Sequence, residues 1–469
     1  MIRSKQVTCE EVIQTYVSHA TQVNNVLNAI VEDRFEQALQ EARDIDKFIA
    51  SNVKTEEEIC KDTPLLGIPI TVKESLMLKG LSSNAGRVQP KKIAHSDAEV
   101  VRIMRNAGAI PILVSNTPEL CLFWETFNNV TGKTLNPYDT RRTVGGSSGG
   151  EAALIGSGAS IIGLGTDIAG SLRLPASFTG IFSHKPTAKI ISNEGSIPTC
   201  LDERVDDYFV VGPLTRYAED LPLVMQLITK PELKNELKLH ETVPLKNIKF
   251  FYMEKEFESA LASNVDKDIT EAMSAFVDYL KRTHGIVTQK VTIKEMWYSH
   301  AIAAQLLLNL DKIDCQFYDE NMEFKLLPEL FRFVTFRSKT TLPIILYGVF
   351  KMFYELFLRK SFPDILQANE NLKKVFKDLL GDNGVLLYPT FTGPAHYHFS
   401  MFYKALDFSY LGIFNALGLP VSNCPAGFNS EGLPIGFQVI ANAKNDRLTL
   451  AVAQEINTLF GGWKSPSDK

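Results

Sequence analysis

The sequence has few of the features that mark a secreted, a membrane-spanning or a nucleic-acid-binding protein. Its 469 residues include six scattered cysteines and no CxxC pair, which argues against a disulfide framework or a zinc site and favours reduced thiols in an intracellular protein. The longest apolar run, Leu342–Phe350, is about half the 18–20 residues that span a bilayer. There is no dense Lys/Arg block and the net charge is -5, so nucleic acid is not an expected partner. The cysteines are Cys9, Cys60, Cys121, Cys200, Cys315 and Cys424.

The chain is longer than the roughly 250–300 residues at which single cores stop growing, so length alone allows two domains or one large sheet-centred fold. Strand and helix patterns alternate, which predicts an α/β fold with a largely parallel sheet. Residues of about 295–375 differ, because they are rich in Phe, Leu and Tyr and have a helical pattern. Strands are expected at 65–72, 110–114, 160–165, 248–253, 287–293, 385–390, 419–425 and 433–440, helices at about 8–50, 96–108, 151–157, 172 onward and 266–282, and a turn at 184–187.

Three glycine-rich or strand-end segments carry residues of catalytic type. Gly145–Gly150 contains Ser147, and Ser171 follows 24 positions later at the end of a second glycine-containing loop. Lys73 ends an apolar strand upstream. No histidine lies within ten residues of any of these segments. The combination therefore indicates a hydrolase whose general base is a neutral amine rather than an imidazole.

The loop before Ser171 is a candidate oxyanion hole. Ser171 is expected between a strand and a helix, so the backbone N–H groups of Ile168, Ala169, Gly170 and Ser171 can converge on one point and bind negative charge. Gly170 beside the nucleophile would let a substrate carbonyl approach closely. The alternatives are a phosphate-binding glycine loop and a plain tight turn.

Ser147 and Lys73 each have a structural interpretation beside the catalytic one. Glycines on both sides of Ser147 permit a strained or cis peptide, whereas a flexible linker is disfavoured by the apolar helix pattern that follows. A buried lysine without an anionic partner loses its charge and becomes a competent base near neutrality. Alternatively, Lys73 pairs with a carboxylate such as Glu74 or Asp167, or extends to solvent.

Together these segments resemble the amidase signature family, and the resemblance covers nearly the whole chain. It implies a single amidase signature domain over 1–469, with a large mixed twisted β-sheet surrounded by α-helices and a helical, apolar insert at about 295–375. The segments that carry the resemblance are Gly67–Glu74, Asn116–Glu119, Gly145–Gly150, Gly165–Ala176, His184–Thr187, Phe414–Pro420 and Gly432–Gln438.

The resemblance also implies a Ser-Ser-Lys triad. Ser171 would be the nucleophile, Ser147 the bridging serine after a cis peptide, and Lys73 the base. Neutral Lys73 would draw a proton from Ser147, which draws one from Ser171 as it attacks the amide carbonyl, while the N–H groups of 168–171 hold the oxyanion. Neither a metal nor an organic cofactor is expected.

Within the family, the stretches around Gly80, Gly149–Gly158 and Asp167-Ile168 most resemble the fatty-acid amide hydrolases of the type 2 branch. This implies a lipid amide as the small-molecule substrate, with Cys121 as a substrate contact. The 295–375 insert would line an acyl channel or touch a membrane surface, the alternative being an ordinary buried helix pair. A homodimer is left open.

Three features depart from the family pattern. Ala169 and Ser183 stand where the family commonly has glycine, and Ala169 would tighten the oxyanion loop if its position required a positive φ. Type 2 relatives usually carry a hydrophobic N-terminal anchor upstream, which this sequence lacks. A truncated form and membrane binding without that helix are the two explanations.

Other functions remain in competition. Gly145–Gly149 formally fits the G-x-S-x-G motif of Ser-His-Asp hydrolases, which would need His396 or His398 as the base. Inside the family, the alternatives are a short-chain amidase and the ammonia-releasing chain of a glutamine-dependent amidotransferase. A non-enzymatic lipid-binding relative is disfavoured by the intact lysine and serines.

Overall fold

The computed structural model describes residues 1–198, 200, 202–256, 262–310 and 326–468. Their strands form one sheet in the order β1-β3-β2-β6-β8-β7-β12-β13-β11-β9-β10, and β4 pairs with β5 separately. The strands are β1 (Ile30–Asp33), β2 (Pro69–Lys73), β3 (Ile110–Ser115), β4 (Phe127–Asn128), β5 (Gly132–Lys133), β6 (Ile162–Asp167), β7 (Phe182–Lys185), β8 (Val210–Thr215), β9 (Lys249–Tyr252), β10 (Gln289–Lys290), β11 (Gly384–Pro389), β12 (Val421–Phe428) and β13 (Pro434–Ala441).

The sheet is mixed, as the family resemblance implied. Six of the ten pairings described in the large sheet are antiparallel and four are parallel, so the expectation of a largely parallel sheet is wrong. Two of the antiparallel pairings lie at the centre, where β8 runs antiparallel to both β6 and β7, and the other four involve β1, β12 and β13. Neither β7 nor β8 was predicted, and the expected turn at 184–187 is wrong in its first half, because β7 continues to Lys185.

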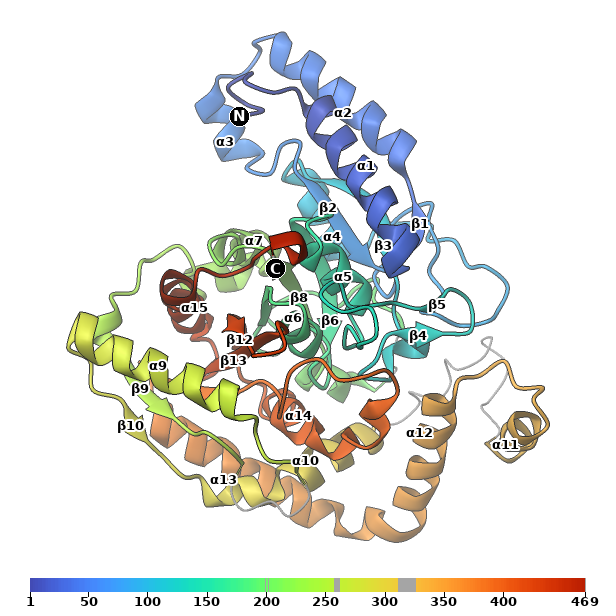
Figure 1. Cartoon of the computed structure of the whole chain (residues 1–469), viewed down its shortest axis with the longest axis vertical. Coiled ribbons are helices and arrows are strands. Elements are labelled where there is room, and N and C mark those ends of the chain that lie inside the picture. Colours follow the sequence, from blue (N-terminus) through green and yellow to red (C-terminus); the bar gives the residue numbers. More distant parts are fainter. Residues whose placement is uncertain (199, 201, 257–261, 311–325, 469) are drawn as a thin grey trace.

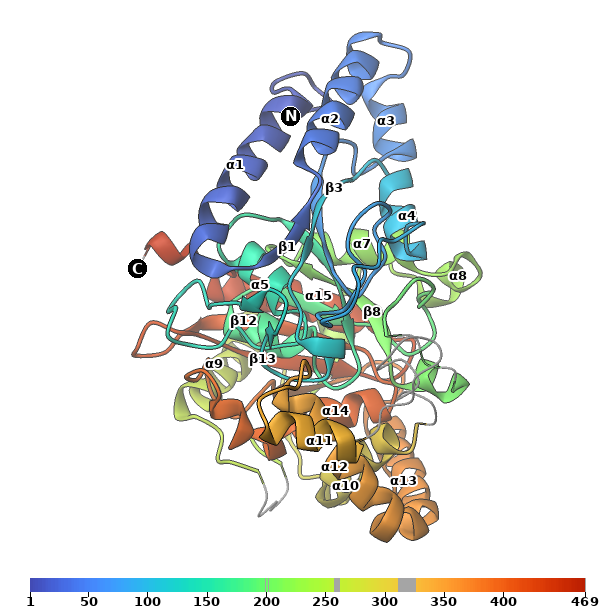
Figure 2. The same cartoon turned by 90° about the vertical axis from the view of Figure 1, so that its right-hand side faces the viewer.

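Helices surround the sheet (Figure 1). The α1–α2 pair lies at one end, where α2 packs on β3, and α9 and α13 lie at the other end (Figures 1 and 2). The helices are α1 (Cys9–Leu27), α2 (Phe35–Ala50), α3 (Glu56–Asp62), α4 (Glu99–Asn106), α5 (Gly149–Gly156), α6 (Arg173–Phe178), α7 (Asp220–Ile228), α8 (Lys234–Leu237), α9 (Lys267–His284), α10 (Ser299–Leu308), α11 (Leu326–Val334), α12 (Leu342–Phe353), α13 (Phe362–Leu380), α14 (Ser409–Ala416) and α15 (Asp446–Phe460).

Local sequence signals explain some of these boundaries. Thr8 and Glu11 form a capping box that begins α1. The helical stretch expected to Ala50 is interrupted by β1, which pairs with β3 at the sheet edge. The helix expected over 96–108 is α4, which begins after Ala98 and has no side-chain cap.

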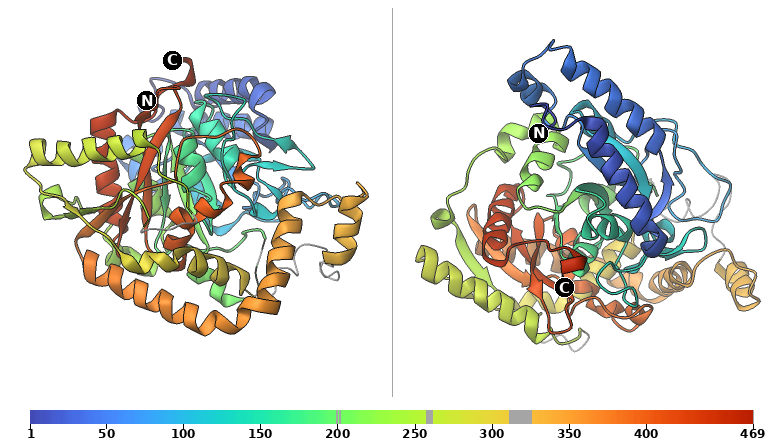
Figure 3. Two further views of the ribbon diagram at one scale, coloured as in Figure 1. Left: turned by 60° about the horizontal axis from the view of Figure 1, so that its bottom comes forward. Right: turned by 45° about the horizontal axis from the view of Figure 1, so that its top comes forward.

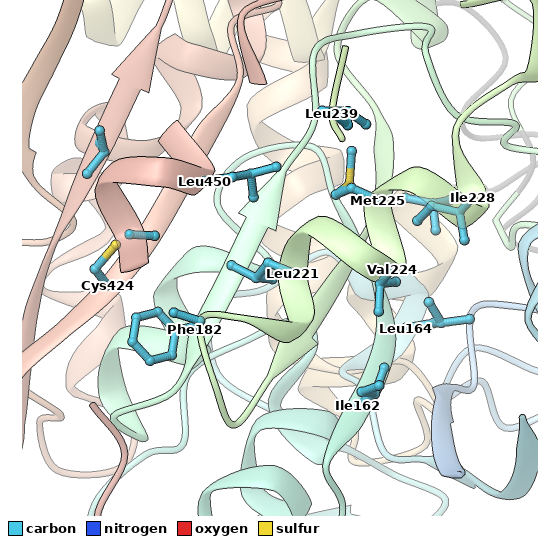
Figure 4. Close-up of a cluster of buried hydrophobic side chains, with 14 of the residues drawn as sticks. Ile162, Leu164, Phe182, Leu221, Val224, Met225, Ile228, Leu239, Cys424 and Leu450 are labelled. Carbon is cyan, nitrogen blue, oxygen red and sulfur yellow. The ribbon is translucent and has the colours of Figure 1, made fainter. Parts of the chain in front are cut away.

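The main apolar core holds the strand that leads into the candidate oxyanion loop. Ile162 and Leu164 of β6 pack with Phe182 of β7 and with Leu221 and Val224 of α7 (Figure 4). Each such side chain contributes about 1.5–3 kcal/mol when fully buried. Because β6 is fixed by this packing, the loop that follows Asp167 starts from a rigid base.

The 295–375 segment is helical in the part that the structure describes, namely α10, α11, α12 and α13. Helices α11 and α12 stand out at one edge of the molecule (Figures 1 and 3). Residues 311–325, including Cys315, lie outside the described residues. None of the helices in the described ranges is both long enough and apolar enough to cross a membrane.

Candidate active site

Lys73 and Ser147 meet in the interior of the protein. Lys73 ends β2 and Ser147 precedes α5, and both side chains are essentially inaccessible to solvent. The Nζ atom of Lys73 lies 2.6 Å from Oγ of Ser147 and 2.9 Å from Oγ1 of Thr166. The peptide bond between Gly146 and Ser147 is cis. The structure thus brings together a lysine and a serine that are 74 positions apart.

The environment of Lys73 favours a neutral amine. Burial lowers the pKa of Lys73 from its ordinary value, against smaller opposing effects of Cys121 and of the Asp167 and Glu151 carboxylates. The carboxylate of Glu74 is occupied elsewhere, since it accepts hydrogen bonds from Ser82 Oγ and the backbone N–H of 86. Lys73 Nζ contacts two hydroxyls, those of Ser147 and Thr166, and the thiol of Cys121 also interacts with it.

Ser171 lies between β6 and α6, in a loop that contacts the loop of Ser147 and Ser148. The backbone N–H of Ser148 donates to the carbonyl of Ser171 over 3.1 Å, which ties the two serine loops together. Ser171 is only 5% exposed, so a substrate must enter a confined space to reach it. The strand that leads to Ser171, β6, also carries Thr166 just before its last residue, and Thr166 contacts Lys73 of β2.

Asp167 organises the loop that carries Ser171. Its carboxylate accepts hydrogen bonds from the N–H groups of Gly170 (2.7 Å) and Leu172 (3.0 Å) and forms a fully buried ion pair with Arg173. Burial would raise the pKa of Asp167, but Arg173 and these hydrogen bonds lower it to about 2. Because the Gly170 N–H is engaged, an oxyanion hole here rests chiefly on the N–H groups of Ile168, Ala169 and Ser171.

The replacement of glycine by Ala169 causes no backbone conflict. The left-handed residue of the loop is Gly170, with φ of 101°, and Ala169 is not among the described residues with positive φ. A Cβ atom on Gly170 would lie 2.5 Å from Cδ1 of Leu411, so glycine is required there for two reasons.

Trp124 supports the same loop and was not predicted. Its indole N–H donates to the carbonyl of Ala169 over 2.8 Å, and its ring stacks on Phe408 at 5.5 Å. Trp124 lies 45 positions before Ala169 in an irregular segment, where no local pattern marks such a role.

Cys121 lies at the edge of the site. Its Sγ atom is 3.2 Å from Oγ1 of Thr117, whose hydroxyl donates to the carbonyl of Ser147. Cys121 and Ile168 both line a cavity of about 360 Å³ that also contains Leu120 and Leu122. The cavity begins at the Ile168 end of the loop before Ser171 and has both apolar and charged lining residues, Lys189 and Asp206 among the latter.

Glu151 is a further buried group that the sequence reasoning missed. It lies on α5 and accepts a hydrogen bond from Thr71 Oγ1 over 2.5 Å. Burial raises the pKa of Glu151 to about 7, although the hydroxyls of Ser115 and Thr71 and the nearby Lys73 lower it. The single clue in the sequence is its position four residues after Ser147.

The histidines proposed for a Ser-His-Asp triad have other partners. His398 bonds Glu125 at 2.7 Å, and the ring of His396 packs against Phe178 and Phe391. Burial lowers the pKa of His396 to about 3. In the described contacts neither histidine touches Ser147 or Ser171.

A serine–histidine–aspartate chain does occur, but deep in the protein. His184 lies 2.9 Å from Ser422 Oγ and 3.1 Å from Asp446 Oδ1, and all three side chains are fully buried. Since no substrate can reach them, they join β7, β12 and α15 rather than act on a ligand. Across the described ranges, no group of three or more His, Cys, Asp or Glu is arranged to hold a metal ion.

An α/β fold with a buried lysine and two serine loops defines a class of hydrolase, and sequence comparison agrees. The Amidase family profile matches residues 11–450. Fatty-acid amide hydrolase 2 of Homo sapiens is 38% identical over 99% of this chain and 88% of its own length, and fatty-acid amide hydrolase 2-A of Danio rerio is 39% identical with the same coverage. The chain belongs to the amidase signature family and is an amide-hydrolysing enzyme.

More distant relatives share the fold. A crystal structure of an amidase superposes with a TM-score of 0.76 at 22% identity, covering 98% of each chain. A fatty acid amide hydrolase structure gives 0.72 at 21% identity, covering 98% of this chain and 84% of its own. These structures confirm the predicted fold class.

Proposed function

We propose that the chain hydrolyses fatty-acid amides to fatty acid and amine through an acyl-enzyme on Ser171. The observation that carries the proposal is the 2.6 Å separation between the Nζ atom of buried Lys73 and Oγ of Ser147. A serine hydroxyl is a weak nucleophile until a base removes its proton, and a desolvated amine can do so near neutrality.

In the proposed reaction, Lys73 takes the proton of Ser147 while Ser147 takes that of Ser171. The Ser171 oxygen forms a bond to the amide carbon, and the carbonyl oxygen becomes an oxyanion held by the backbone N–H groups of Ile168, Ala169 and Ser171. Collapse of this intermediate breaks the C–N bond, and Ser147 gives a proton to the departing amine. Water then attacks the acyl-enzyme, and the same relay releases the fatty acid and restores Ser171.

Thr166 orients the base in this scheme. A neutral amine has two N–H donors and one lone pair. An N–H of Lys73 can donate to Thr166 Oγ1, 2.9 Å away, which leaves the lone pair for Ser147 at 2.6 Å. Thr166 is therefore a positioning residue.

The acyl chain is assigned to the cavity beside Cys121 and Ile168. Its volume of about 360 Å³ falls in the range of small-molecule sites, and Leu120, Leu122 and Phe209 contribute apolar surface. The fatty-acid amide hydrolase 2 relatives, at 38–39% identity, support this substrate class. In this proposal 1–469 acts as one amidase signature domain, with 295–375 as its insert.

The edge of the insert is proposed to contact a membrane surface peripherally. The apolar surface consists of five exposed side chains on α11, on α12 and on the residues that follow each helix. Phe331 and Val334 lie on α11 and Phe336 follows it, whereas Phe353 ends α12 and Phe357 follows it. Phe336 is 99% exposed, and such groups of exposed aromatics mark interaction sites. Basic residues border them, which favours a bilayer over an apolar protein partner.

Hydrolysis of a series of amides with acyl chains of increasing length tests the substrate assignment. Wild-type kcat/KM should rise with chain length, and Lys73→Ala should lose activity on every member. An exposed control, Lys281→Ala, should behave as wild type. Equal wild-type rates for short and long chains would overturn the lipid assignment and leave an amidase. Preference for glutamine would favour the amidotransferase alternative.

Vesicle co-sedimentation tests the membrane contact. Phe331→Ser/Phe336→Ser should bind phosphatidylcholine vesicles more weakly than wild type. The control Val53→Ser/Val287→Ser removes two similarly exposed apolar side chains elsewhere and should bind normally. Equal binding by both double variants would contradict the assignment of this surface. Dimerisation, measured by light scattering, would assign the surface to a second copy of the chain.

A further inference from the structure

A second cavity lies on the other side of the short helical turn that walls the active-site cavity. Its volume is about 580 Å³, and it is lined by charged side chains of the loop around Arg87, of Glu119 and of the α11–α12 connection. Glu119 faces this cavity, while the next two residues, Leu120 and Cys121, face the cavity of the active site. The two cavities share no lining residue.

Among the described residues that line this second cavity, cations outnumber carboxylates. Arg87, Arg332, Arg337 and Lys339 face two carboxylates, Glu119 and Glu329. Glu329 pairs with Arg332 at 3.0 Å and accepts a hydrogen bond from a serine hydroxyl, so those two charges largely cancel.

Glu119 neutralises less than a full charge. It is nearly buried, and burial raises its pKa to about 7, although the hydrogen bond from the Thr341 N–H and the nearby Arg87 lower it. Part of this carboxyl is therefore protonated near neutrality. Arg337 and Lys339 lie at the rim, so the cavity suits an anion with several acceptor oxygens.

The neighbourhood indicates which anion fits. Phe336 is adjacent to Arg337 in sequence and is almost fully exposed, and Phe331 and Val334 lie on the same helix–loop unit. A ligand there meets cations at one end and exposed aromatic side chains at the other. A phospholipid has this arrangement of phosphate and acyl chains, whereas a free anion would use the cations alone.

We propose that this cavity binds the phosphate-bearing headgroup of an anionic phospholipid while the apolar surface contacts its acyl chains. The inference rests on the proposed membrane contact and not on the chemistry of the triad. Since η1 (Glu119–Cys121) separates the headgroup cavity from the active-site cavity, the bound lipid would hold the enzyme with its substrate cavity next to the bilayer.

Vesicle binding with matched charge variants tests the proposal. Wild type should bind phosphatidylcholine vesicles containing phosphatidylglycerol more tightly than phosphatidylcholine alone. Arg337→Gln/Lys339→Gln should lose this preference by about fivefold per charge, roughly 25-fold together. Its binding to phosphatidylcholine alone should stay unchanged, as should its hydrolysis of a short, soluble amide.

The control Lys281→Gln/Arg282→Gln makes the same charge change at the end of α9, far from α11 and α12 (Figure 1). It should keep the wild-type preference for anionic vesicles. An equal loss in this control would overturn the headgroup site, because diffuse attraction would then explain the preference. The headgroup site would also be overturned if Arg337→Gln/Lys339→Gln kept the wild-type preference for anionic vesicles.

Two further measurements separate the remaining explanations. Glycerol 3-phosphate should compete weakly with anionic vesicles for the cavity. The lipid assignment is wrong if glycerol 3-phosphate or inorganic phosphate binds the cavity tightly while the wild type shows no preference for anionic vesicles. The site would then serve a free anion. Wild-type binding to neutral vesicles without preference for anionic ones defeats the headgroup site alone. No binding to either vesicle defeats the membrane contact as well, and neither result touches the amidase proposal.

Discussion

At the scale of single residues, the two hydroxyls around Lys73 decide what its amine can do. The Nζ atom lies within hydrogen-bond distance of both, and in the proposed relay Thr166 accepts one N–H so that the lone pair faces Ser147. We expect Thr166→Val, which keeps the shape and removes the acceptor, to lower kcat by about tenfold or more with little change in KM. Thr215→Val removes another buried threonine hydroxyl and should leave kcat unchanged. Steady-state kinetics on both variants check this, and a wild-type kcat in Thr166→Val would refute the positioning role.

Trp124 supports the loop before Ser171, the proposed oxyanion hole, through one hydrogen bond. Trp124→Phe keeps the ring near Phe408 but leaves the Ala169 carbonyl without its indole donor. A buried acceptor that loses its partner costs about 1–3 kcal/mol, so we expect kcat to fall roughly tenfold while KM changes little. The exposed Trp297→Phe is the control. If thermal stability falls and kcat does not, Trp124 is a packing residue only.

At the scale of elements, the β6–α6 connection is held by the ion pair of Asp167 and Arg173. Arg173→Met would leave Asp167 buried without its cation and should cost about 3–5 kcal/mol of unfolding free energy, measured by urea denaturation. The exposed pair of Arg102 and Glu99 offers the matched control, because Arg102→Met should change stability little. Equal effects of the two variants would contradict this account of α6.

The same ion pair predicts a pH dependence. The folded pKa of Asp167, about 2, lies below its ordinary value of 3.8, so the carboxylate stabilises the fold above 3.8 and this contribution is lost as pH falls toward 2. Arg173→Met should lack most of that acid-induced loss, which urea unfolding at several acidic pH values would show.

The elements also show how far local sequence reaches. The strands that end at Lys73 and Asp167 could be predicted to within one or two residues at those ends, because short apolar runs bounded by glycine are local signals. The direction of β8 could not, since strand direction depends on pairing partners far along the chain. For the same reason the glycine-flanked serines stand out in the sequence, whereas Trp124 and the contact of Asn415 with Asp167, 248 positions apart, do not.

At the scale of the whole molecule, two cavities and one exposed surface lie around the same short turn. Residues of η1 line both the cavity beside Cys121 and the cationic cavity, and Leu120 of η1 packs against Ile344 of α12, a helix that also carries part of the apolar surface. This arrangement would let an enzyme without a membrane-crossing helix in its described residues take a lipid amide directly from a bilayer.

The most direct test of the central claim is the pH dependence of covalent labelling of Ser171 by a fluorophosphonate, followed by mass spectrometry. Because the base must be unprotonated, the wild-type labelling rate should rise with pH through one ionisation below the ordinary lysine value of 10.5. Lys73→Ala should label about 10²–10⁴-fold more slowly and lack that ionisation. Labelling of Ser171 in Lys73→Ala at the wild-type rate, with the same pH dependence, would contradict the account.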